Sequence, residues 1–266
     1  MTVKYSTVEN PSASCGRVFA ILSVCLSLFA FGCRKNVIDP SKVVWSIFVG
    51  DECVGSGVFL GRVDNDGQKN VVLLTARHVV TYNRNCSESL DVVIPGAVSR
   101  MRLRSPIARW FTSRVRSVDC AWLVLEEDEL RDFEYLEWVD LDATLESRAA
   151  PEIGDGLIVA NARKTVPGVC QGFRKITVFF PKNKVLKKIN MNVVCTSALT
   201  VPSDSGSGVF LSVDGIRALR LAGTTTASGL DRDYTAFLSI SNIIDNVAGS
   251  LTGDYDFRLI SCENMW

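Results

Sequence analysis

The chain has 266 residues, of which 47% are hydrophobic and 22% are charged. This composition is typical of a soluble globular protein that can bury one large core or two modest ones, and it excludes intrinsic disorder. Lysine plus arginine and aspartate plus glutamate balance at 29 each. The chain therefore lacks the overall basic excess of a nucleic-acid-binding protein, and no nucleic acid is expected among its partners.

The first predicted element is an apolar run at residues 18–32, "VFAILSVCLSLFAFG", which follows Arg17 and precedes "CRKN". Its 15 residues match the core of a signal peptide and fall short of the roughly 20 that a membrane-spanning helix needs. Gly32 before Cys33 resembles the cleavage box of bacterial lipoproteins, which makes Cys33 a candidate lipid anchor. The alternative is a plain secretory signal cut near Gly32. Both interpretations predict export to the cell envelope or periplasm, and only the anchor would contact a membrane.

Short runs rich in valine, isoleucine, phenylalanine and leucine follow, with glycine, asparagine and aspartate clusters between them. Regularly spaced runs of this kind, without helical patterns between them, favour an all-β sandwich or barrel. The expected strands are residues 43–50, 55–61, 70–76, 90–96, 120–126, 156–162, 175–180, 191–197 and 208–215.

One helix is expected near the end of the chain, at residues 241–251. Ser241 or Asn242 would be its N-cap, because short polar side chains accept hydrogen bonds from the first turn. Its apolar residues recur at helical spacing. They are Ile243, Ile244, Val247 and Leu251.

Charge is unevenly distributed in the middle of the chain. Six arginines lie between Arg100 and Arg116, and the alternation in "RMRLR" is that of a strand with one solvated face. Nine acidic residues follow between Glu126 and Asp142. Because this acidic stretch is poor in strand-forming residues, we interpret it as the region of a linker between two β units.

Export affects how the cysteines are interpreted. Beyond Cys33, six cysteines follow the leader, and in an oxidising compartment they permit up to three disulfides in any of 15 connectivities. The alternative is that they are buried as small apolar residues. Because the chain has one histidine and no C-x-x-C pair, a zinc site is not expected. The six are Cys53, Cys86, Cys120, Cys170, Cys195 and Cys262.

The turn "VPSDSGSGVF" at 201–210 places Ser205 between an aspartate and a glycine. Turn chemistry alone explains these residues, so a nucleophilic role for Ser205 requires a base and a group that orients the base. His78, the single histidine, closely follows an apolar run, and Asp119 directly precedes another. The ordinary alternatives are a packed histidine and an aspartate that caps a strand. A carboxylate beside so apolar a run nevertheless needs a hydrogen-bonding partner.

The three segments occur in the order His, Asp, Ser, which chymotrypsin-like enzymes use and subtilisins and α/β-hydrolases do not. "LLTARHVV" resembles the histidine motif of trypsin-like serine proteases, "VDCAWLVL" their aspartate motif and "SDSGSGVF" their nucleophile motif. "GSGVFLG" at 55–61 is similar to the start of the bacterial branch that includes the HtrA proteases. "RLAGTTTASG" at 220–229 resembles the strand that lines the substrate cleft in this family.

The resemblance implies two antiparallel β-barrels and a serine endopeptidase that acts on polypeptides without a cofactor. The first barrel would supply His78 and Asp119, and the second would supply Ser205. Asp119 would orient His78, His78 would accept the Ser205 proton, and the backbone N–H groups of Ser203 and Ser205 would form the oxyanion hole. The corresponding organisation is a leader at 1–32, a first barrel at 33–135, a linker at 136–155, a second barrel with the helix at 156–252, and a tail at 253–266.

The resemblance also places the primary specificity pocket near Leu199 and Thr200, with Thr226 and Ser228 on the strand that lines it. No acidic residue occurs at 196–203, so a substrate cation would be buried there without a partner. A small or medium apolar side chain is therefore expected in the pocket. The alternative is that Asp231 or Asp233, further along the chain, reaches the pocket floor from another loop.

Ser203 departs from the family's pattern, which has glycine at this oxyanion-hole position. Glycine adopts backbone angles that cost a serine energy, so a misformed hole is the alternative prediction. The protein would then be an impaired pseudo-protease whose barrels bind envelope proteins. The residues after 229 leave no room for a PDZ domain, so HtrA-type regulation is not expected.

Overall fold

The computed structural model describes the chain from residue 39 onward, with gaps. Among these residues no helix is long and apolar enough to span a membrane. The predicted leader and its candidate lipid anchor Cys33 lie outside the described residues, as do Cys86 and Cys262. The described residues are 39–65, 68–81, 89–95, 102–106, 110–113, 115, 117–126, 139, 150–182, 185–212, 219–228, 233–244 and 259–261.

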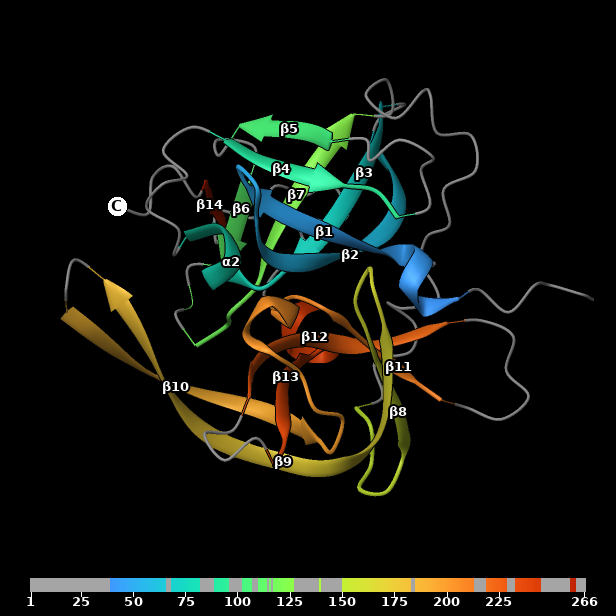
Figure 1. The fold of residues 1–266 in the computed structure, drawn as a ribbon, viewed down its shortest axis with the longest axis vertical. Helices are drawn as coiled ribbons and strands as arrows, with labels where there is room; N and C mark the ends of the chain where they lie inside the picture. Colours follow the sequence, from blue (N-terminus) through green and yellow to red (C-terminus); the bar gives the residue numbers. More distant parts are fainter. Residues whose placement is uncertain are drawn as a thin grey trace, which may run out of the picture. The chain divides into compact units, whose positions relative to one another are not determined.

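The first of two curled antiparallel sheets combines the first half of the chain with one strand from its end (Figure 1). Its eight strands lie in the order β14-β6-β7-β3-β2-β1-β4-β5. A short 3-10 helix, η1 (Pro40–Val43), leads into it. The strands are β1 (Val44–Val49), β2 (Glu52–Asn65), β3 (Gln68–Thr75), β4 (Ser89–Val93), β5 (Arg102–Pro106), β6 (Trp110–Ser113), β7 (Ala121–Glu126) and β14 (Leu259–Ser261).

The second sheet closes into a barrel in the order β10-β13-β12-β11-β8-β9. Its longest pair, β9 and β10, extends beyond the barrel as a hairpin (Figure 1). A 3-10 helix, η4 (Pro202–Asp204), precedes β11. The strands are β8 (Gly156–Ala160), β9 (Thr165–Lys182), β10 (Val185–Thr196), β11 (Gly208–Leu211), β12 (Arg220–Ser228) and β13 (Thr235–Ser239).

Three clusters of buried side chains form the core. One fills the first sheet and includes Trp45 and Leu73, and another fills the closed barrel and includes Phe237. The third contains residues of both, such as Val58 and Leu238. Each large apolar side chain buried in this way contributes roughly 1.5–3 kcal/mol. The shared cluster holds the two barrels together, so loops from both can contribute to one site.

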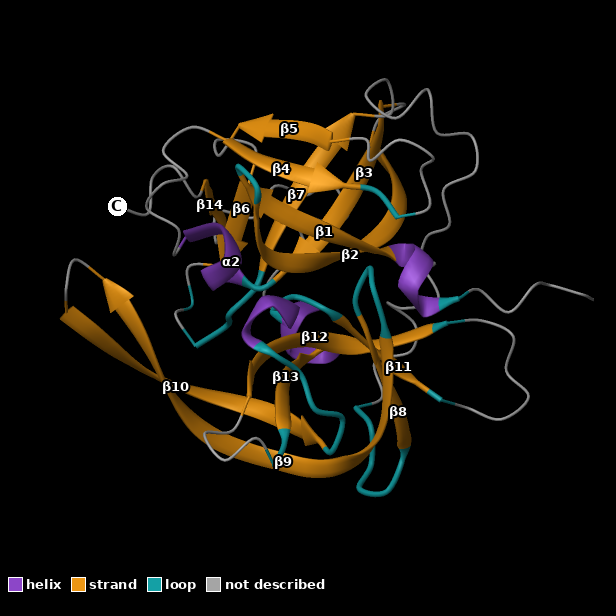
Figure 2. Ribbon diagram, in the orientation of Figure 1, coloured by secondary structure: helices purple, strands orange, loops and turns teal. Residues whose placement is uncertain are grey.

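The prediction of an all-β fold with two antiparallel barrels is confirmed, because strands dominate both units and helices are few (Figure 2). Each expected strand overlaps an observed one, and β5 lies in the arginine-rich stretch. The strands β6, β13 and β14 were not predicted, and β14 lies within the predicted tail. β6 has only four residues and β14 only three, and β13 runs directly into a helix, so none of them has the length and flanking turns of a typical strand signal.

Residues 240–244 are helical, at the start of the expected helix. Ile243 and Ile244 are buried, as their spacing predicted, whereas Val247 and Leu251 lie outside the described residues. The predicted N-cap is wrong. Because the helix begins immediately after β13, the hydroxyl of Ser239 takes this role and accepts a hydrogen bond from the N–H of Asn242 at 3.4 Å.

None of the four described cysteines is joined to another in a disulfide. Cys120, Cys170 and Cys195 are buried, which agrees with the alternative that they pack as small apolar residues. Burial raises the pKa of the Cys170 and Cys195 thiols. Cys53 is half-buried.

Only Val139 and residues 150–155 of the predicted linker are described, so its boundaries stay a prediction. Val139 is buried, and its N–H donates to the carbonyl of Phe59 at 3.0 Å. This point of the segment therefore packs against β2 of the first sheet.

Candidate active site

Two neighbouring strands of the first sheet bring His78 and Asp119 together. β3 pairs with β7 so that Thr75 lies opposite Ala121. His78 follows β3 on the short helix α2 (Arg77–Thr81), and Asp119 precedes β7. Nδ1 of His78 lies 2.7 Å from Oδ2 of Asp119, and the backbone N–H of His78 donates to Oδ1 at 3.0 Å. The carboxylate thus holds both the ring and the backbone of the histidine.

Asp119 is almost fully buried, yet the pKa of its carboxyl is low. Burial by itself raises this pKa, but the charge of His78 and its hydrogen bond, the charge of Arg77 and a hydrogen bond from Thr226 hold it at about 2. Oγ1 of Thr226 donates to Oδ2, and Thr226 lies on β12 of the second barrel. Asp119 is therefore ionised at neutral pH and is held from both barrels.

The turn that carries Ser205 is fixed by backbone hydrogen bonds to both barrels. The carbonyl of Ser205 accepts from the N–H of Ser56 in β2 at 2.8 Å. The N–H of Gly206 donates to the carbonyl of Thr225 in β12 at 2.9 Å. Ser205 lies at the C-terminal end of η4, between these two anchors.

Only glycine fits at position 206. Its φ angle is +81°, in the left-handed region that other residues rarely adopt. A Cβ atom placed there would lie 2.1 Å from the carbonyl oxygen of Ser56 and 2.3 Å from Oγ1 of Thr75. The glycine after the candidate nucleophile is therefore needed for the close approach of this turn to the first barrel.

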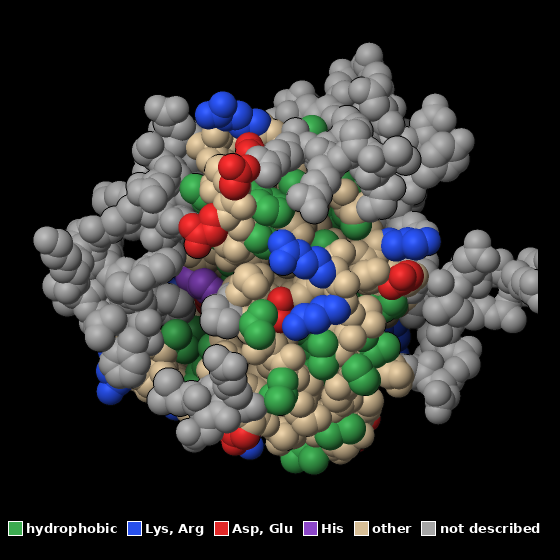
Figure 3. All heavy atoms as spheres, in the orientation of Figure 1, with side chains coloured by type: hydrophobic (Ala, Val, Ile, Leu, Met, Phe, Trp, Pro, Cys, Tyr) green, Lys and Arg blue, Asp and Glu red, His purple; other side chains and the backbone are tan. Residues whose placement is uncertain are grey.

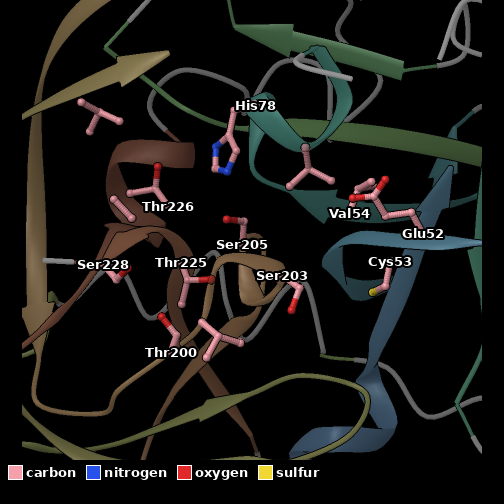
Figure 4. A pocket seen from close by; sticks show the side chains of 14 residues that line it. Glu52, Cys53, Val54, His78, Thr200, Ser203, Ser205, Thr225, Thr226 and Ser228 are labelled. Atoms are coloured by element: carbon pink, nitrogen blue, oxygen red, sulfur yellow. The ribbon is translucent and has the colours of Figure 1, made fainter. Parts of the chain in front are cut away.

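His78 and Ser205 line the same cavity, which has a volume of about 570 Å³. Figure 4 shows the Ser205 side chain beneath the imidazole ring, with Ser203 beside it. The histidine side chain is 19% exposed, and Figure 3 shows the imidazole in purple at the surface. The ring is thus reachable from solvent. The lining residues are Glu52, Cys53, Val54, His78, Val79, Val178, Thr200, Val201, Ser203, Ser205, Thr225, Thr226, Ala227 and Ser228.

Three of the four residues predicted for the specificity pocket, Thr200, Thr226 and Ser228, line this cavity, whereas Leu199 does not. Thr200 is held in place because its N–H and its hydroxyl both bond to Oγ1 of Thr235, at 3.1 and 3.0 Å. Neighbouring side chains of an extended segment point in opposite directions. Leu199 is accordingly 49% exposed at the surface.

Ser203 is the middle residue of η4. In this 3-10 turn the N–H of Asp204 donates to the carbonyl of Val201 at 2.8 Å. The same i to i+3 pattern directs the N–H of Ser205 toward the carbonyl of Pro202. The oxyanion hole formed by Ser203 and Ser205 stays a prediction.

Sequence reasoning missed the contact between Thr226 and Asp119 and assigned Thr226 only to the pocket wall. It also missed Glu52 and Cys53, which line the cavity from the first barrel. The run of three threonines at 224–226 was a usable signal, because hydroxyl groups in a buried strand need hydrogen-bonding partners. For Glu52 and Cys53 no motif pointed to the site.

No family model and no curated protein matches the sequence. Solved structures do match the fold. The Rv3671c protease of M. tuberculosis in its active form matches with a TM-score of 0.52 and 12% identity, over 98% of this chain and 97% of that one.

Two further proteases match in the same way. A mutant of the tobacco etch virus protease matches with a TM-score of 0.51 and 12% identity, over 87% of each chain. Kallikrein-related peptidase 10 matches with a TM-score of 0.50 and 13% identity, over 82% of this chain and all of that one, a coverage of 100%. At such identities the likeness concerns the fold alone. The chain has the chymotrypsin-like double-barrel fold of these proteases.

Proposed function

We propose that this protein is a serine endopeptidase that hydrolyses peptide bonds through Ser205, His78 and Asp119. One observation carries the proposal. The buried, ionised Asp119 binds Nδ1 of His78 at 2.7 Å, and His78 shares its cavity with Ser205. A packed histidine or a turn serine needs no such arrangement.

The hydrogen bond to Asp119 selects the tautomer of His78. With Nδ1–H donating to the carboxylate, the neutral ring carries its lone pair on Nε2, which can accept a proton. Ser205 Oγ would lose its proton to Nε2 as it attacks the scissile carbonyl carbon. The ionised Asp119 would stabilise the imidazolium that forms.

The remaining steps follow from the same groups. The imidazolium would return the proton to the leaving amine, which leaves an acyl ester on Ser205. A water molecule, deprotonated by His78, would then release the acid and restore the serine. Backbone N–H groups of Ser203 and Ser205 would stabilise the negative oxygen in both steps.

The cavity wall on β12 supports a preference for small or medium side chains before the scissile bond. Thr226, Ala227 and Ser228 of β12 line the cavity, as does Thr200 ahead of η4, and none of these side chains carries a charge. An arginine or lysine buried there would lack a partner among these residues.

Labelling with a fluorophosphonate, which reacts with activated serines, tests the proposal on the full chain. The wild type should be labelled at Ser205, and Ser205→Ala and His78→Ala should not. If the wild type resists labelling while it remains folded and cleaves no peptide, the proposal is wrong.

The turn η4 favours a second candidate, a pseudo-protease that binds polypeptides without cleaving them. Its 3-10 pattern directs the N–H of Ser205 toward the carbonyl of Pro202, so this turn would have to rearrange before the N–H could donate to a substrate oxygen. A protein that binds peptides in the cavity, remains unlabelled and shows no turnover would have this function. Isothermal titration with a peptide library that is also assayed for cleavage separates the two candidates.

We further propose that the protein is exported and is anchored by lipid at Cys33, on the basis of the apolar run at 18–32. Mature protein should partition with membranes, and Cys33→Ser should release it. An intact mass with an unmodified N-terminus would disprove the anchor.

A further inference from the structure

The carboxylate of Asp204 lies directly before the candidate nucleophile and is only 5% exposed. Its Oδ1 accepts a hydrogen bond from Nδ2 of Asn161 at 2.6 Å. Its Oδ2 accepts from the N–H of Val201 at 2.9 Å and lies 3.2 Å from Nζ of Lys164. A buried carboxylate needs such partners, because an unpaired charge in the interior is strongly unfavourable.

Both side-chain partners, Asn161 and Lys164, come from the turn between β8 and β9, which is fixed by its own internal hydrogen bonds. Oδ1 of Asn161 accepts from the N–H groups of Arg163 and Lys164 at 2.8 and 2.9 Å. The N–H of Asn161 donates to the carbonyl of Lys164 at 3.0 Å. The turn therefore presents one amide and one ammonium group to Asp204 from a fixed frame.

The backbone of Asp204 is bound as completely as its side chain. Its N–H donates to Val201 at 2.8 Å, and its carbonyl accepts from the N–H of Ser207 at 3.1 Å and from Oγ1 of Thr225 at 2.7 Å. A rotation of Asp204 would break several of these bonds and would move Ser203 and Ser205, its neighbours on either side. The orientation of Asp204 thus sets the orientation of the nucleophile turn.

We propose that Asn161 and Lys164 are positioning residues that hold Ser205 in its attacking orientation through Asp204. This inference rests on the proposed peptidase function. The cation that pairs with Asp204 is a side chain of the second barrel itself, at 3.2 Å from Oδ2. Catalytic competence then depends on the β8–β9 turn, which itself carries no catalytic group.

The matched pair Lys164→Gln and Arg163→Gln in the full chain tests the proposal. Both residues are exposed on the same turn, and Arg163 contributes only its backbone N–H to the network. Lys164→Gln should lower kcat by about tenfold or more with KM within about twofold, and should slow fluorophosphonate labelling in proportion. Arg163→Gln should match the wild type, and Lys164→Arg should recover most of the lost kcat.

A role of Lys164 in stability alone predicts a different pattern. It would lower the thermal midpoint while the folded fraction kept the wild-type kcat, and that result would overturn the proposal. Failure of Lys164→Arg to recover activity, or an equal loss in Arg163→Gln, would also overturn it. A wild type that neither cleaves peptides nor reacts with the fluorophosphonate would instead overturn the proposed function, and this inference with it.

Should Lys164→Gln prove too unstable to assay, Asn161→Ser provides the second measurement. It removes the amide that bonds to Oδ1 of Asp204 and the oxygen that accepts from the N–H groups of Arg163 and Lys164, while the Lys164 side chain itself is unchanged. The same loss of kcat at constant KM is expected, and an unchanged kcat in this variant contradicts the proposal.

Discussion

The two barrels hold their shares of the candidate active site in different ways. The first barrel holds His78 through side chains, with Asp119 bound to the ring at 2.7 Å. Ser205 of the second barrel is held through the backbone, by a bond from the N–H of Ser56 in the first barrel to the Ser205 carbonyl and by a bond from the N–H of Gly206 to the carbonyl of Thr225. Side-chain contacts respond to charge and pH, whereas backbone contacts respond to conformation. Substitutions around His78 should therefore alter the response to pH, whereas substitutions around Ser205 should alter the backbone conformation.

The largest effect is expected from removing the reacting groups. His78→Ala and Ser205→Ala should each reduce kcat by about 10⁴-fold or more, and the double variant should be no worse, because the groups act as one unit. Peptide hydrolysis measures the effect, and unchanged thermal unfolding is the control. Substantial cleavage by Ser205→Ala would show that another group is the nucleophile.

Gly206→Ala should disrupt the backbone hydrogen bonds that fix the turn of Ser205. Its methyl group would lie 2.1 Å from the Ser56 oxygen at a φ angle of +81°, so unfolding free energy should fall by about 3 kcal/mol or more. Gly154→Ala is the matched control. Gly154 has a φ angle of +95° with nothing within 4 Å, so only the backbone cost of about 1–2 kcal/mol applies. If urea unfolding shows the same loss of unfolding free energy in Gly206→Ala and Gly154→Ala, the close approach of Gly206 to the first barrel does not explain the effect.

The contact between the Asp119 carboxylate and His78 in the first barrel should be sensitive to acid. The pKa of Asp119 is lowered from 3.8 to about 2 on folding, so its ionised form stabilises the protein above pH 4, and this is lost as pH falls through about 2. The contribution is about 2 kcal/mol. Urea unfolding between pH 5 and 2 should show a decline that is smaller in Asp119→Asn. An identical decline in that variant would place the sensitive group elsewhere.

Thr226 links the two halves, because it donates to Asp119 from the second barrel. Thr226→Val should lower kcat by about tenfold, since a hydrogen bond to a charged group is worth about 1.5–3 kcal/mol. Thr226→Ser keeps the donor and should retain most of the activity. If Thr226→Val and Thr226→Ser have the same kcat, the hydrogen bond from Thr226 to Asp119 has no catalytic role.

The smallest effect concerns Glu52, the one carboxylate among the described residues that line the cavity. Figure 4 shows it on the opposite side of Ser205 from Thr226 and Ser228. Peptides with lysine after the scissile bond should be cleaved up to about fivefold faster than those with glutamate, the modest value of an exposed ion pair. Glu52→Gln should abolish the difference. If Glu52→Gln still prefers lysine over glutamate at this position, another residue causes the preference.

The sequence by itself determined the all-β class and the candidates His78, Asp119 and Ser205. These depend on local patterns: apolar runs separated by turn residues, and short motifs whose order along the chain is directly visible. The strand windows overlap the observed strands for the same reason, because alternation and turn chemistry are properties of neighbouring residues.

Only the tertiary structure decided which further residues support the site. Thr226 bonds to Asp119 across 107 positions of sequence, and Asn161 to Asp204 across 43. Whether Leu199 or Thr200 faces the cavity depends on the bonds of Thr200 to Thr235, which lies 35 positions away. The contact of Thr226 arises when the shared core packs the two barrels together, and the other two arise when the second barrel closes. No periodicity or motif in a single segment encodes them.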